Sequence, residues 1–244
     1  MQRLLQIRRH SGQGSVTPLL VIVVVASILT IVVLLDRKAD VIYDSPQTDG
    51  AERTYEDLPR SVLIRVPFTS QAPLLDWGDP YQEACEETSL LIVHHFLQRL
   101  GFDPISADKE IVELTEWVAA DGFPEDITLR ELAQVAQRRY GYTPYLYENP
   151  SIEDLKNMIA SGNPVIVPAA GRKLKNPYYS GPGPWYHMLV LTGYDERNFV
   201  TNDPGTRRGY GYKYTYSILY NAIHDWTGVK EDIEKGPIVV LVIR

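Results

Sequence analysis

An apolar run from Pro18 to Leu35 is the strongest hydrophobic feature of the sequence. It reads PLLVIVVVASILTIVVLL and contains no charged side chain. As an α-helix these 18 residues would be about 27 Å long at ~1.5 Å per residue, close to the ~30 Å hydrocarbon core of a bilayer. The run is long for a signal peptide, and LLDRKAD after it is a poor cleavage site, so the pattern favours a transmembrane signal anchor over a cleaved signal or a buried core helix.

The charges beside this run predict its orientation. Residues 1–17 carry three arginines and no acid, so we expect them to stay in the cytoplasm, although Arg37 and Lys38 weaken the asymmetry. The rest of the chain is then extracytoplasmic, and the protein is a single-pass protein of the cell membrane. Residues 36–60 are polar and mostly acidic, which is typical of a linker. A domain of residues 61–244 follows.

Within this domain, helical periodicity comes first and strand-like runs come second. The expected helices are 85–100, 108–122, 128–141 and 151–162, with a short one at 216–226. The expected strands are 61–68, 143–147, 163–170, 187–195, 198–203, 209–216 and 237–244. This order predicts an α+β fold with a largely antiparallel sheet. A helical half that faces a β half leaves a cleft between them, where a site is expected.

Composition narrows the function. The formal net charge is −7, and an acidic body argues against nucleic acid as a partner. The sequence has neither the ligand spacing of a zinc or calcium site nor a phosphate-binding glycine pattern. We therefore predict no metal and no cofactor.

Cys85 is the only cysteine of the chain, and it lies where an apolar helix begins. One cysteine cannot form an internal disulfide, and a free thiol outside the cytoplasm is open to oxidation, so its presence suggests a chemical role. A helix start near residues 83–84 would place the thiol at the positive end of the helix, which lowers a cysteine pKa. The alternative start, at Asp79-Pro80, would leave Cys85 more than a turn inside. Glu86 and Glu87 favour the later start, and the helical geometry predicts that they point away from the sulfur.

A nucleophilic cysteine needs a base, and His187 is the best candidate among five histidines. His10 lies on the other side of the predicted membrane span. His94 and His95 lie about 13–15 Å from the cysteine along its own helix, and His224 is most simply a surface residue. His187 opens the strand 187–195, after two aromatic residues.

The third and fourth members of the candidate site follow from neighbouring segments. If strands 187–195 and 198–203 pair as a hairpin, Asp203 lies beside the position opposite His187 and can orient the imidazole. Asp203 can also serve as the first side-chain acceptor of an ordinary turn at NDPG. For the oxyanion donor, Gln71 at the end of the first strand is preferred, and Gln82 is the alternative.

The segments VPFTSQ, Cys85 at a helix start, YHMLVLTGYD and NDP together resemble the bacterial papain-like cysteine peptidases related to the bacteriocin-processing, double-glycine leader peptidases. The resemblance spans roughly residues 66–215 and is closest to stand-alone members without a transporter. It implies a papain-like fold in which Cys85 is the nucleophile, His187 the base, Asp203 the orienting residue and Gln71 the oxyanion donor. The family usually reads Cys-Gly-Pro, where this chain reads Cys-Glu-Glu.

These observations predict a membrane-anchored, extracytoplasmic cysteine peptidase that acts on peptides or proteins. Trp185 and Tyr186, next to His187, are the candidate substrate-binding residues. The same three catalytic groups also suit a cell-wall amide hydrolase or a transglutaminase-type acyl transfer. The Cys-Glu-Glu sequence also leaves open a catalytically inactive binding domain with the same fold.

Overall fold

The computed structural model describes Ile42–Tyr43 and residues 58–244. All described residues belong to one compact unit, Val41–Arg244. The predicted N-terminus 1–17 and apolar segment 18–35 lie outside the described residues. Among the helices that the structure describes, none combines the length and the apolar character that crossing a bilayer requires.

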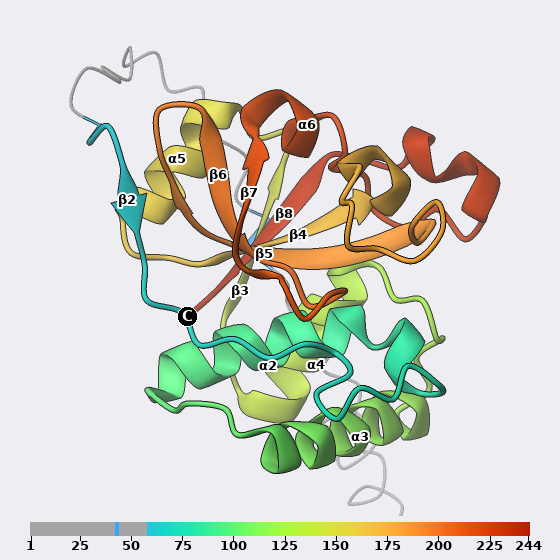
Figure 1. Ribbon diagram of the computed structural model, residues 1–244. Coiled ribbons are helices and arrows are strands. Elements are labelled where there is room, and N and C mark those ends of the chain that lie inside the picture. The colour runs from blue at the N-terminus through green and yellow to red at the C-terminus, as the bar shows by residue number, and fades with distance from the viewer. Residues whose placement is uncertain (1–41, 44–57) are drawn as a thin grey trace, which may run out of the picture. The chain divides into compact units, whose positions relative to one another are not determined.

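An eight-stranded sheet runs through the described unit, and its pairings are antiparallel except at one edge (Figure 1). The strand order is β1-β3-β8-β4-β5-β6-β7, with β2 pairing to β5. The strands are β1 (Ile42–Tyr43), β2 (Val62–Leu63), β3 (Pro144–Glu148), β4 (Val165–Ala170), β5 (Tyr186–Tyr194), β6 (Asn198–Asn202), β7 (Tyr210–Thr215) and β8 (Val239–Ile243). Only β1 pairs in parallel, with β3.

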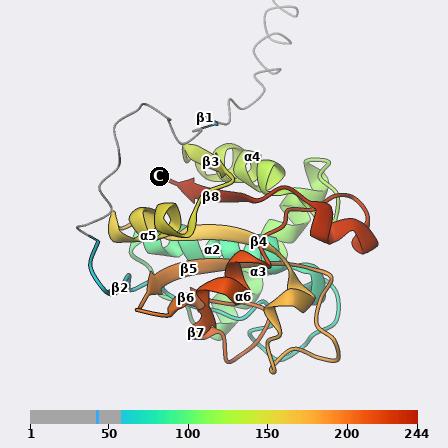
Figure 2. The same ribbon diagram turned by 90° about the horizontal axis from the view of Figure 1, so that it is seen from above.

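The helices α2 (Cys85–Gln98), α3 (Pro104–Ala120) and α4 (Leu129–Tyr140) lie together on one side of the sheet (Figure 1). The helices α5 (Ile152–Ala160) and α6 (Tyr216–Tyr220) lie on the other side (Figure 2). Three 3₁₀ turns complete the unit: η2 (Tyr81–Glu83), η3 (Gly171–Leu174) and η4 (Lys230–Lys235). The predicted α+β class with a largely antiparallel sheet is confirmed.

Strand β5 shows why the sheet needs cover on both faces. All nine of its residues are buried. Met188 and Val190 pack with the side chains of α2 to α4, whereas Leu189 and Leu191 pack with those of α5 and α6. Successive side chains of a strand point to opposite faces, so an unbroken apolar run such as HMLVL is typical of a strand buried on both sides. This packing fixes β5 against the N-terminal half of α2.

Two predicted elements differ from the structure. The strand expected at 61–68 is limited to Val62–Leu63, because the backbone turns where the Val66 N–H donates to the Ile64 carbonyl. The helix expected at 216–226 ends at Tyr220, because Ile223 forms a bridge to Ala169 of the sheet.

The predicted linker 36–60 contains β1. Ile42 and Tyr43 pair with Tyr145 and Leu146 of β3, so this part of the segment adds to the sheet edge. Residues 44–57 lie outside the described residues.

Candidate active site

Cys85 is the first residue of helix α2. Ala84 precedes it as the N-terminal cap, and the Thr88 N–H donates to the Ala84 carbonyl at 3.0 Å as the first bond of the helix. The later of the two predicted helix starts is therefore correct, and Pro80 leads into the separate turn η2 instead. The Cys85 side chain is a free thiol and is only 6% exposed.

The thiol contacts Glu86, contrary to the expectation that this side chain points away. The Cys85 Sγ donates a hydrogen bond to Glu86 Oε2 at 2.9 Å. A glutamate side chain is long enough to fold back over the preceding residue in the first helical turn. Glu86 is 1% exposed, so it is held there without water.

This contact and burial also overturn the expected low thiol pKa. Burial raises the pKa of Cys85 well above its usual value, and the charge of Glu86 and the hydrogen bond to it raise it further. The backbone N–H of Met188 acts in the opposite direction by donating to the sulfur. The same bond shows that the sulfur lies against β5, beside the residue that follows His187.

The two glutamates after the cysteine are both buried. Burial, and then the neighbouring Glu87, raise the pKa of Glu86 well above its usual value. Burial raises the pKa of Glu87 to about 7. Glu86 Oε1 and Glu87 Oε2 have no hydrogen-bond partner among the described residues. The raised pKa of Glu86 favours its protonated form, whose Oε2 accepts from the S–H.

His187 and Asp203 form a buried pair. His187 Nε2 lies 2.8 Å from Asp203 Oδ1, and the two side chains are 2% and 0% exposed. The pairing of β5 with β6 produces this contact, with Val190 opposite Asn202. Because the carboxylate accepts from Nε2–H, the imidazole Nδ1 is the nitrogen that can act as a base.

Asp203 is surrounded by donors. Its Oδ1 also accepts from the Gly205 N–H at 3.0 Å, and its Oδ2 accepts from Asn176 Nδ2, Tyr179 Oη and Tyr214 Oη at 3.1, 2.8 and 2.6 Å. Burial alone would raise the pKa of Asp203, but the charge of His187 and these hydrogen bonds outweigh it and lower the pKa below its usual value. Asp203 is thus an anion at neutral pH, as an orienting residue requires.

Cys85 and His187 line one cavity of about 310 Å³. The cavity lies between η2 and the start of α2 on one side, and the start of β5 and the loops before β5 and after β6 on the other. Gln71, Gln82 and Tyr186 also line it. The structure therefore brings the sulfur and the imidazole of the predicted site to the same opening, with Asp203 behind the ring.

The two candidate oxyanion donors are engaged elsewhere in this state. Gln71 Nε2 donates to the carbonyls of Tyr81 and Gln82, at 2.7 and 3.1 Å, and so holds the turn before α2 in place. Gln82 Nε2 donates to Asp79 Oδ1 at 2.7 Å. The oxyanion role of either side chain stays a prediction.

The two aromatic residues before His187 differ in their surroundings. Tyr186 lines the cavity, but it is 6% exposed and its hydroxyl donates to buried Asp225. Trp185 is not among the residues that line this cavity, and the guanidinium of Arg172 lies 3.4 Å from the centre of its ring. Their role in substrate binding stays a prediction.

Sequence reasoning missed several residues that support the imidazole. Asn176 and Tyr214 bind the carboxylate of Asp203, but Asn176 comes from the loop before β5 and Tyr214 from β7. A methyl group on Gly205 would lie 2.7 Å from His187 Cε1, so a side chain there would displace the ring. The dense Gly-Pro-Tyr loop before His187 was the available signal: Tyr179 in that loop packs edge-on against the ring, with centres 5.4 Å apart.

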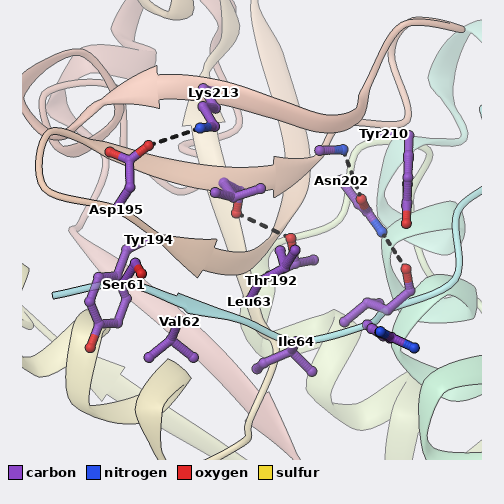
Figure 3. Close-up of a pocket in the computed structure, with 14 residues that line it drawn as sticks. Ser61, Val62, Leu63, Ile64, Thr192, Tyr194, Asp195, Asn202, Tyr210 and Lys213 are labelled. Carbon is purple, nitrogen blue, oxygen red and sulfur yellow. Dashed lines mark hydrogen bonds and ion pairs between the residues drawn. The ribbon is translucent and has the colours of Figure 1, made fainter. Parts of the chain in front are cut away.

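A second cavity, of about 450 Å³, contains none of the predicted catalytic residues (Figure 3). It lies between residues 61–66 and the strands β5 to β7. At one end Lys213 binds Asp195, and at the other Asn202 donates to the Val66 carbonyl at 3.2 Å. Asn202 thus separates this cavity from the pair that its neighbour Asp203 forms with His187.

The model of the Peptidase_C39 like family matches residues 63–232. A C39-like peptidase from Bacillus anthracis is similar in structure, with 16% identity, a TM-score of 0.49 and coverage of 76% of this chain and 98% of that chain. Xylellain, a cysteine protease from Xylella fastidiosa, has 14% identity, a TM-score of 0.40 and coverage of 78% and 87%. No curated protein matches the sequence.

Proposed function

The chain belongs to the peptidase C39-like family and is a cysteine-type peptidase, and from this premise we propose that it hydrolyses peptide bonds through Cys85, His187 and Asp203. The geometry of Cys85, His187 and Asp203 supports the proposal. Cys85 and His187 line the same cavity, and His187 Nε2 lies 2.8 Å from the fully buried Asp203. A nucleophile, a base and a group that orients the base are the three parts that this chemistry needs.

The reaction proceeds in two halves. Cys85 Sγ attacks the carbonyl carbon of the scissile bond while its proton passes to His187 Nδ1, and Asp203 stabilises the imidazolium through Nε2–H. The imidazolium then gives this proton to the leaving amine, the C–N bond breaks and a thioester remains. Water attacks the thioester with His187 again as the base, and the thiol is restored.

The resting thiol is neutral, which decides how the attack begins. Because burial and Glu86 raise the thiol pKa, a stable thiolate–imidazolium pair is disfavoured. The S–H must turn from Glu86 Oε2 towards His187 Nδ1, so that proton transfer accompanies the attack.

Gln71 is the proposed oxyanion donor, together with the backbone N–H of Cys85. The N–H at the first position of a helix has no partner within the helix, so it can face the developing oxyanion. For Gln71, the longer of its two bonds, at 3.1 Å to the Gln82 carbonyl, is the one to exchange for the substrate oxygen. The loss of one oxyanion donor lowers kcat by roughly 10²–10³.

Hydrolysis of a fluorescent casein by the 244-residue chain in mild detergent tests the triad. We expect Cys85→Ser to abolish hydrolysis, and His187→Ala and Asp203→Asn each to lower kcat by about a hundredfold or more. His224→Ala is the matched control, because His224 is a partly buried histidine that bonds through Nδ1 to the Gly236 carbonyl and lies outside the cavity. Activity of His187→Ala equal to that of His224→Ala would contradict the proposal.

The proposed location is the outer face of a cell membrane. It is supported by the charge-free run Pro18 to Leu35 and by the three arginines before it. In expressing bacterial cells, we expect the chain to stay in carbonate-washed membranes and external protease to digest the domain. Deletion of residues 18–35 should release the chain from the membrane. Retention of the deleted chain, or protection from external protease, would refute the anchor or its orientation.

A further inference from the structure

The catalytic cavity continues into a larger one. This larger cavity, of about 650 Å³, shares Trp77, Ser180 and Gly205 with the cavity that holds Cys85 and His187. A peptide bound at the sulfur can therefore extend along these shared residues without leaving the cleft. We call this larger space the Arg207–Arg208 cavity, because both arginines line it.

The two arginines give this cavity a positive charge. Both are exposed, and within residues 58–244 neither forms an ion pair with a carboxylate. The residues that line the cavity include no acid. The Arg208 guanidinium lies 4.7 Å from the centre of the Tyr178 ring, which orients it by a cation–π contact. The cavity thus offers two cations without counterions, beside two aromatic rings.

The turn that carries the arginines is fixed to the catalytic pair. The Asp203 N–H donates to the Gly209 carbonyl at 3.1 Å, and the Gly209 N–H donates to the Thr206 carbonyl at 3.2 Å. A side chain at residue 209 would lie 1.7 Å from the Asp203 carbonyl oxygen, so only glycine allows this close approach. Because the turn starts at the residue that binds His187, these bonds anchor the backbone that carries the two arginines to the catalytic pair.

Part of the wall of the catalytic cavity is acidic. Glu83 and Asp126 both line it, and burial followed by their mutual repulsion raises the pKa of Glu83. The cleft is therefore polarised, with carboxyl groups next to the helical side and guanidinium groups on the turn after β6. A substrate residue of negative charge is favoured at one end only, which also sets the direction in which a peptide lies.

We propose that the Arg207–Arg208 cavity is a specificity subsite that binds an acidic side chain of the peptide substrate. The proposal rests on the proposed function, because it assigns the residue that binds beside the scissile bond at Cys85. A guanidinium binds a carboxylate through paired, charge-assisted hydrogen bonds. The rings of Trp77 and Tyr178 contact the aliphatic part of the same substrate residue.

The test compares quenched fluorescent peptides that contain Asp or Glu at one position with peptides that contain the isosteric Asn or Gln. With the 244-residue chain in mild detergent, we expect kcat/KM to be roughly three- to tenfold higher for the acidic member of the best pair. The difference should lie mainly in KM and shrink at 0.5 M salt. In the double variant Arg207→Glu/Arg208→Glu, the ratio should fall to about one or below.

Arg197→Glu is the matched control, because Arg197 is an exposed arginine in the turn between β5 and β6 and lines neither cavity. It should keep the wild-type ratio. Peptides with an amidated C-terminus distinguish an acidic side chain from a terminal carboxylate: if the preference disappears on amidation, the side-chain assignment is wrong. An unchanged ratio in the double variant, or an equal loss in Arg197→Glu, would overturn the subsite.

Binding separates failure of the subsite from failure of the triad. Fluorescence anisotropy of the labelled peptides with Cys85→Ala needs no hydrolysis, and it should show the same acidic preference and its loss in the arginine double variant. An acidic preference in binding without hydrolysis by the wild-type chain would refute the catalytic proposal alone. Hydrolysis without any acidic preference in either assay would refute the subsite alone.

Discussion

Glu86 sets the state of the reactive thiol at the residue scale. Its Oε2 accepts from Cys85 Sγ at 2.9 Å, and its charge is, after burial, the main cause of the raised thiol pKa. Burial and the neighbouring Glu87 raise the pKa of this carboxyl group as well, which favours its protonated form. At higher pH, ionised Glu86 opposes thiolate formation.

The substitution Glu86→Gln should increase the reactivity of the thiol. It removes the negative charge beside the sulfur and supplies an amide N–H that can donate to a thiolate, so the pKa of Cys85 falls. We measure the rate of alkylation by iodoacetamide from pH 6 to 10 by intact mass. For Glu86→Gln the rate should begin to rise at a lower pH than for wild type and should be several times higher at pH 8.

Glu87→Gln is the control for this experiment. Glu87 is the last of the causes that raise the thiol pKa, so its neutralisation should shift the alkylation profile less than that of Glu86. A Glu86→Gln profile that coincides with wild type, or moves to higher pH, would show that Glu86 does not hold the proton on the sulfur.

At the scale of elements, Asp225 joins the helical layer to the sheet. Its carboxylate accepts from the Leu129 N–H at the start of α4, at 3.0 and 3.2 Å, and from the Tyr186 hydroxyl of β5, at 2.9 Å. Asp225 is 5% exposed. It therefore fixes the start of α4 against the strand that carries His187.

Asp225→Ala should lower the free energy of unfolding by about 3 kcal/mol, because the N–H groups of Leu129 and Trp226 lose their acceptor and the Tyr186 hydroxyl keeps only its bond to the Ile127 carbonyl. Urea unfolding followed by circular dichroism measures the change. Thr128→Ala, which removes only the capping side chain of α4, should cost about 1 kcal/mol. Equal losses in both variants would mean that Asp225 acts as a simple cap and not as a link between layers.

Elements set by local sequence were predictable, and those set by distant contacts were not. Ser151 caps α5 within a capping box, and the apolar run after His187 forms β5. Helix α2 was expected to stop at Gly101, but it ends at Gln98 with Arg99 in the left-handed region at φ 58°. The N–H groups of Arg99 and Leu100 donate to the Phe96 and His95 carbonyls and so end the helix. The expectation that a helix ends at glycine does not detect such bonds.

In the candidate site, too, contacts set by local sequence were predictable and contacts between distant segments were not. The contact of His187 with Asp203 could be derived from hairpin pairing, because the two residues lie on adjacent strands joined by a short turn. The donors to Asp203 Oδ2 on Asn176 and Tyr214 come from other segments, and no local pattern identifies them. The direction of the Glu86 side chain is a choice of rotamer inside a packed core, and helical periodicity does not determine it.

At the scale of the whole molecule, the buried acids make stability depend on pH in two opposite ways. The lowered pKa of Asp203 contributes stability that is present above its ordinary value of 3.8 and is lost as the pH falls below it. The raised pKa values of Glu86, Glu87 and Asp225 have the opposite effect on the pH dependence of stability. Their neutral forms suit the buried sites, so the stability that they contribute is present below their unfolded pKa values and is lost as the pH rises through the folded ones.

Glu87 allows this dependence to be measured. Its pKa of about 7 in the folded chain, against an ordinary value of 4.5, means that the folded state binds more protons than the unfolded state between these values. The free energy of unfolding should therefore fall by up to roughly 3 kcal/mol from pH 4.5 to pH 8 on account of this group.

The side chain introduced by Glu87→Gln cannot ionise, so the urea midpoint of this variant should fall less steeply over this range and exceed that of wild type at pH 8. Glu116→Gln, at an exposed position of α3, should keep the wild-type slope. Parallel curves for wild type and Glu87→Gln would show that Glu87 does not carry a buried proton.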